Sequence, residues 1–164
     1  MATRDLLRLL AGLAAFGSAL IHLAIAPEHM TEAAYIGWLF LAGGGLLLLV
    51  ALAALTDDTV TRTREFMAVW HLGALVCAGM VVGLVASRTT GLPGGYREGW
   101  DEPEAWASLV LELVFLGVYV ARRRMARGNR REGVRSDAEP AAEVQALGGQ
   151  HDAAAGGGRA PIGR

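Results

Sequence analysis

The chain has 164 residues, of which 53% are hydrophobic, and its formal net charge at pH 7 is -1. The hydrophobic residues are gathered in long blocks, which is the composition of a membrane protein. The single cysteine, Cys77, excludes an intrachain disulfide. Nothing in the charge indicates a nucleic-acid partner.

Four apolar blocks predict four transmembrane helices, at about 6–26, 35–55, 66–86 and 105–121. A helix needs roughly 20 apolar residues, with a lower bound of roughly 17, to cross a hydrocarbon core about 30 Å thick. The first three blocks meet the central value and the fourth meets only the lower bound. The first block ends on an A-x-A pattern, as signal peptides do. It is longer than a signal core of roughly 7 to 15 residues, so we expect it to remain as a span.

Arginines are distributed unevenly among the connections, and their positions predict the orientation. They flank the first block, lie between the second and third, and follow the fourth in a cluster at 122–131. The connection at 27–34 has no arginine, and the one at 87–104 has more acidic than basic residues. We therefore expect an all-α, up-down bundle of four transmembrane helices in a bacterial inner membrane, with both termini cytoplasmic.

The composition changes after the fourth block, which predicts a transmembrane domain at 1–127 and a tail at 128–164. The tail has too few apolar residues to offset the entropy lost on ordering, so we expect it to be disordered in the cytoplasm. The cluster Arg122–Arg131 is expected to bind anionic lipid headgroups. The bilayer is thus the expected partner, nucleic acid is not, and a second copy or another membrane protein stays open.

His22 and Glu112 are ionisable residues within apolar blocks, where such groups need a structural or functional reason. A rise of 1.5 Å per residue places His22 roughly 6 Å and Glu112 roughly 10 Å below the outer edge. In an up-down bundle the two would face each other and relieve each other's burial cost. A hydrogen bond that locks two helices is one interpretation, and a proton-linked or metal-linked role is the other.

The metal-linked role can be stated more specifically as a metal site with His22, His29 and Glu112 as candidate ligands. Along a continuous helix the two histidines would lie about 10 Å apart, too far for zinc bonds of about 2 Å to one ion. We expect the helix to break at Pro27, and only a chain that turns back there could bring them together. The sequence has no HExxH or CxxC spacing, so a divalent metal stays open. Oxygen ligands near this corner would be Glu28, Asp101 and Glu102.

Bis-histidine heme ligation within one chain is disfavoured. His71 lies roughly 22 Å below the outer edge, against roughly 6 Å for His22. Two axial ligands of one heme must lie at nearly the same depth, so this pair does not fit. A heme held by one histidine, or by two chains, stays open.

The third connection has turn-forming residues, among them Gly91 and Pro93. We expect it to form a compact loop that leads back into the fourth helix. Arg88 lies at the expected outer end of its helix, where the positive-inside rule predicts few basic residues. We expect it to reach the headgroups or to pair with Glu102 or Glu28. Within the third block, Gly79 and Gly83 form a GxxxG pair, for which we expect close helix packing inside the bundle.

The segments HLAIAPEH and SRTTGLPGG, followed by EP and by a glutamate in the fourth block, resemble a group of small four-helix integral membrane proteins of bacteria. That group has no assigned function, and the likeness covers residues 6–121. An acid expected near Ser108 is missing. A looser likeness to DoxX-type membrane proteins rests on helix count and on the start of the first helix. The first resemblance marks His22, Glu28, His29, Arg88, Gly91, Pro93, Glu102 and Glu112.

The leading functional hypothesis is non-enzymatic. An outer-leaflet cluster of His, Glu and Arg side chains would bind a small ligand, a proton or a metal ion, or would only staple the bundle. The alternatives are a membrane redox or quinone-linked subunit, which would need a bound cofactor, and a small transporter, which would need to oligomerise.

Overall fold

The computed structural model of the chain describes residues 3–56 and 64–128. Its helices are α1 (Thr3–Glu32), α2 (Ala34–Leu55), α3 (Arg64–Arg88) and a fourth helix, Pro103–Gly128. All four are long and apolar enough to cross a membrane, so the predicted all-helical architecture with four candidate spans is confirmed. The described residues up to Arg122 belong to one compact unit, and those from Arg123 onward belong to another. The predicted tail lies outside the described residues from position 129 onward.

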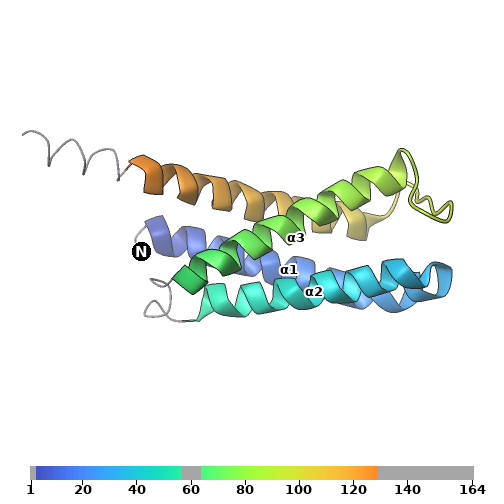
Figure 1. The fold of residues 1–164 in the computed structure, drawn as a ribbon, viewed down its shortest axis with the longest axis horizontal. Helices are drawn as coiled ribbons and strands as arrows, with labels where there is room; N and C mark the ends of the chain where they lie inside the picture. The colour runs from blue at the N-terminus through green and yellow to red at the C-terminus, as the bar shows by residue number, and fades with distance from the viewer. Residues whose placement is uncertain (1–2, 57–63, 129–164) are drawn as a thin grey trace, which may run out of the picture. The chain divides into compact units, whose positions relative to one another are not determined.

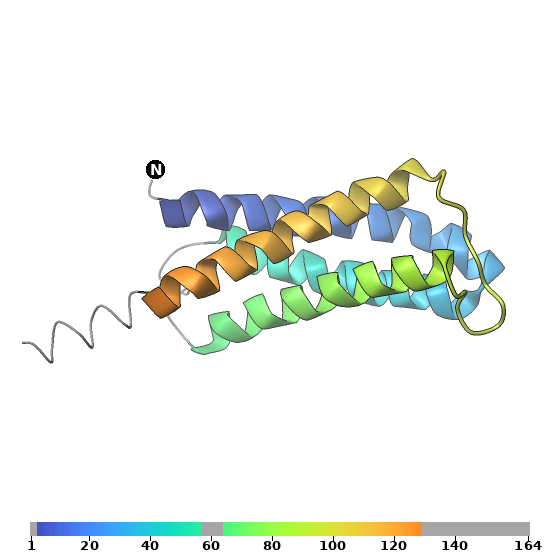
Figure 2. The same cartoon turned by 90° about the horizontal axis from the view of Figure 1, so that it is seen from above.

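The helices extend beyond the predicted apolar blocks. The fourth helix begins at Pro103, as expected for a proline in a first helical turn, and it continues to Gly128 rather than ending near 121. The prediction followed the apolar residues alone, whereas a helix can run on into the polar interface. Figures 1 and 2 show the segment 89–102 at the same end as the turn between α1 and α2.

The expected break at Pro27 is wrong, because α1 continues through it to Glu32. A proline inside a helix removes one backbone donor and ordinarily costs about 3 kcal/mol. Here the turn around Pro27 packs directly on α2. A Cβ added to Gly37 would lie 2.8 Å from the carbonyl oxygen of Ala26 and 2.8 Å from the amide nitrogen of Met30. The two helices therefore approach each other closely one turn beyond the hydrogen bond that Pro27 removes.

Replacing Gly37 by alanine should therefore force α1 and α2 apart at this turn. We expect the free energy of unfolding to fall by about 1 to 3 kcal/mol, as overpacking does elsewhere. Reversible unfolding by SDS in mixed micelles, followed by circular dichroism, measures it. Gly45→Ala on the same helix is the control, because its added Cβ would meet no atom within 4 Å. Equal losses in both variants would contradict the close-contact explanation.

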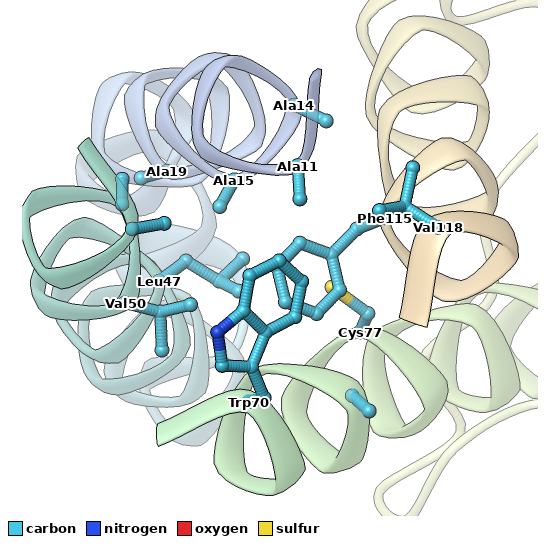
Figure 3. Packing of buried hydrophobic residues seen from close by; sticks show 13 residues of the cluster. Ala11, Ala14, Ala15, Ala19, Leu47, Val50, Trp70, Cys77, Phe115 and Val118 are labelled. Carbon is cyan, nitrogen blue, oxygen red and sulfur yellow. The ribbon is translucent and has the colours of Figure 1, made fainter. Parts of the chain in front are cut away.

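The core of the first unit is built from small residues on α1 and larger ones on the other helices (Figure 3). The rings of Trp70 and Phe115 stack with their centroids 5.7 Å apart. Large apolar side chains also face outward, among them Leu75, which is 71% exposed. Small residues inside and large apolar residues outside are typical of helices packed in lipid. The alanines that α1 contributes to this core cluster are Ala11, Ala14, Ala15 and Ala19.

Candidate functional site

Polar side chains gather in two neighbouring groups near the turn between α1 and α2. The helix cluster comprises Ser18, His22 and Glu112, all buried. The loop cluster comprises residues of α1, of the end of α3 and of the segment 89–102, and its members are His29, Ser87, Arg88, Tyr96, Glu98 and Glu102.

The predicted contact between His22 and Glu112 is confirmed. The Nε2 atom of His22 lies 2.8 Å from Oε1 of Glu112, and the Ser18 hydroxyl donates to the same oxygen at 3.2 Å. Ser18 and His22 lie one turn apart on α1 and so reach the same point on the fourth helix. Two side chains of α1 thus converge on one oxygen of Glu112.

Each carboxylate and imidazole of the helix cluster keeps one atom without a partner. The buried Nδ1 of His22 has no hydrogen bond among the described residues. The Oε2 atom of Glu112 likewise receives none there, since both of the residue's bonds go to Oε1. The cluster therefore has one unpartnered polar atom on each of these two residues.

His29 differs from His22 in that both of its ring nitrogens have partners. Nδ1 lies 3.0 Å from the carbonyl oxygen of Ile25, and Nε2 lies 3.0 Å from Oε1 of Glu98. Both partners are oxygens, one of a backbone carbonyl and one of a carboxyl group. The Phe40 ring lies between the two histidines, with centroids 5.2 Å from His22 and 4.9 Å from His29.

Arg88 is the centre of the loop cluster, and its side chain is only 1% exposed. One terminal nitrogen donates to Glu98 at 2.6 Å and the other to Glu102 at 2.8 Å. Of the two predicted partners, Glu102 is confirmed. The structure places Glu98 in the second position instead of Glu28, which is exposed. Buried arginine is held well by two carboxylates because its planar fork matches them.

Glu98 is the site residue that the sequence reasoning missed. It accepts hydrogen bonds from Tyr96 at 2.5 Å and from Ser87 at 3.3 Å, in addition to those from Arg88 and His29. Burial raises the pKa of Glu98. The Tyr96 hydroxyl and the charges of Arg88 and His29 outweigh it, so the pKa lies below the ordinary 4.5. No sequence spacing distinguishes Glu98 from the other acidic residues of this connection.

The compact loop predicted for the third connection is confirmed. Gly91, Gly94 and Gly95 have φ of 81°, 85° and 81°, which favour glycine. The amide of Gly91 donates to the carbonyl of Ala86 at 2.9 Å and closes the end of α3. The Tyr35 hydroxyl of α2 donates to the carbonyl of Pro93 at 2.6 Å. These contacts hold the loop that carries Glu98.

A cavity of about 680 Å³ adjoins both clusters. One part of its lining is polar and includes His22, Glu112 and the loop cluster, and the other part is apolar and comes from α2 and α3. Gly79 and Gly83 line the apolar part, and a Cβ at either would meet nothing within 4 Å. The close packing predicted for this GxxxG pair is therefore wrong: the missing side chains leave open space.

The described residues do not assemble a metal site: no three His, Cys, Asp or Glu side chains among them converge as ligands. The candidate ligands His22 and His29 lie on one continuous helix and bind different carboxylates, Glu112 and Glu98. The turn back at Pro27 that would have joined them does not occur. Comparison of the chain with protein-family models, with curated proteins and with solved structures gave no match.

Proposed function

We propose that this protein binds a small amphipathic molecule within a bacterial inner membrane and is not an enzyme. The observation that carries the proposal is the cavity of about 680 Å³, which joins apolar walls to a buried polar end. Its volume falls within the range of about 300 to 1,000 Å³ typical of ligand pockets. The apolar walls suit a hydrocarbon body, and the two clusters suit a polar head.

An up-down bundle with both termini in the cytoplasm is part of this proposal. The arginine clusters near the N-terminus and at 122–131 support it through the positive-inside rule. The cavity would then open toward the outer leaflet, since the loop cluster adjoins the arginine-free turn between α1 and α2. A ligand from the periplasmic side or from that leaflet could reach it without crossing the membrane.

The competing interpretation is that the two clusters only staple the helices. Glu98 supports stapling for the loop cluster, because four donors already occupy it. Stapling alone gives no reason for the open space beside Gly79 and Gly83, where larger residues would fill the gap and add packing. Binding and stapling thus make different predictions for a substitution that fills the cavity.

Gly79→Leu should abolish ligand binding while leaving the bundle folded. The probes are octylamine, 1-octanol and octanoate, which share a chain and differ in the head, added to protein in maltoside micelles. At least one should raise the melting temperature saturably in the wild type, because a ligand of the folded state stabilises it. The shift should vanish in Gly79→Leu.

Gly45→Leu is the matched control, because Gly45 also has open space around it but does not line the cavity. It should keep the full ligand-induced shift, and effects of the probes on the micelle itself should be equal in all three proteins. If no probe gives a shift that Gly79→Leu removes, the binding function is wrong and stapling stands.

A further inference from the structure

The unpartnered atoms of the helix cluster indicate one chemical class of ligand. This inference rests on the proposed binding function. We propose that the ligand is a cationic amphiphile, an apolar body with a protonated amine whose N–H group donates to Oε2 of Glu112.

Glu112 supplies the first observation. The residue is 1% exposed and lines the cavity, yet Oε2 has no donor within the described residues. Arg88, the arginine that lines the cavity, binds Glu98 and Glu102 and not Glu112. A buried charge is costly unless it is paired. A ligand ammonium would supply a positive charge and the missing hydrogen bond together.

His22 supplies the second observation. Its buried Nδ1 has no partner among the described residues, and His22 also lines the cavity. His29 shows that this is particular to His22, because its two nitrogens are both occupied. A ligand head placed beside the helix cluster therefore meets two atoms that lack a hydrogen bond, Nδ1 of His22 and Oε2 of Glu112. An amine head can donate to Oε2, whereas a carboxylate head would lie against another carboxyl group.

The charges of the whole lining also favour a cationic ligand. Its arginine, Arg88, is already paired with Glu98 and Glu102 of the loop cluster. A cavity lined by an excess of one charge concentrates ligands of the opposite charge. The lining carboxylates are Glu28, Glu32, Glu98, Glu102, Glu104 and Glu112.

The melting-temperature titration with eight-carbon probes tests the inference. Octylamine should bind about tenfold or more tightly than 1-octanol, a difference of about 1.4 kcal/mol, and octanoate should bind weakest. Octyltrimethylammonium keeps the positive charge but has no N–H donor. It should bind several-fold more weakly than octylamine, a comparison that needs no variant.

Glu112→Gln removes the charge and keeps an oxygen that can accept from His22. It should remove the preference for octylamine over octanol, and circular dichroism of the variant checks that it is folded. Asp101→Asn is the matched control, because that carboxylate is exposed to water and is not among the lining residues, and it should keep the preference. The result is measured as the ratio of the two dissociation constants in each protein.

Three results would overturn the inference while the binding function survives: equal affinity for all heads, trimethylammonium binding as tight as the amine, or a preference that persists in Glu112→Gln. In each case the shifts would still depend on Gly79. Absence of any shift that depends on Gly79 would overturn the binding function and this inference together.

Discussion

Replacing Arg88 by methionine is expected to lower the free energy of unfolding by about 3 kcal/mol, the largest effect of any single substitution considered for this chain. Methionine keeps much of the apolar stem but removes the guanidinium. Glu98 and Glu102 then face each other without the charge that joins them. Removing one partner of a buried ion pair typically costs about 3 to 5 kcal/mol. The lower end applies because Glu102 is 46% exposed in its side chain.

The effect should depend on pH in a definite direction. Glu98 has a pKa below 4.5 in the folded protein. Its stabilisation is therefore present above the unfolded value and is lost as the pH falls through the folded pKa. Burial and the nearby charge of Glu98 raise the pKa of Glu102, so protonation of Glu102 favours the folded state and offsets part of that loss. The difference between the wild type and Arg88→Met should narrow below about pH 4.5.

Equilibrium unfolding in mixed micelles from pH 7 to pH 3 measures both claims. Arg97→Met is the control, because Arg97 lies in the same loop, is exposed, and donates only to the carbonyl of Thr89. It should cost well under 1 kcal/mol, as exposed polar contacts usually do. Arg88→Lys should recover part of the loss, since one ammonium cannot bridge two carboxylates in the same way. A gap between wild type and Arg88→Met that is constant with pH would contradict the role given to Glu98.

Depth along a helix is what made the contact between His22 and Glu112 predictable. Each residue adds a fixed rise, so two residues on antiparallel neighbours can be compared by counting from a shared membrane edge. The four spans were predictable for a similar reason, because bilayer thickness fixes their length. Neither the depth of a residue along its helix nor the length of a span depends on how the helices pack.

Features that depend on packing were not predictable. Pro27 was expected to end α1, but the helix continues through it to Glu32 and packs closely on Gly37 of α2. Glu98 reaches Arg88 only because a loop with three left-handed glycines brings it back to the end of α3. The cavity beside Gly79 depends on the separation of helices, which no single segment encodes. The same glycine pattern fits close packing and open space equally well.

Glu112→Ala is expected to be the second most damaging substitution, with a loss of about 2 kcal/mol in the free energy of unfolding. It leaves the Nε2–H of His22 and the hydroxyl of Ser18 buried without an acceptor. An unsatisfied buried donor costs about 1 to 3 kcal/mol. Hydrogen bonds between membrane helices average less, about 0.6 kcal/mol. The expected loss for Glu112→Ala is therefore smaller than that for Arg88→Met.

Glu112→Gln should lose about 1 kcal/mol or less, because its amide oxygen can still accept from both donors. A second substitution gives a sharper result. If the loss in Glu112→Ala comes from stranded donors, removing one of them should relieve it, so Ser18→Ala should cost less in the Glu112→Ala background than in the wild type. Such non-additivity is the mark of residues in one hydrogen-bond network. Additive losses would mean that Glu112 stabilises the bundle through its volume alone, and the Ser18, His22 and Glu112 contacts would then be a consequence of helix packing rather than one of its causes.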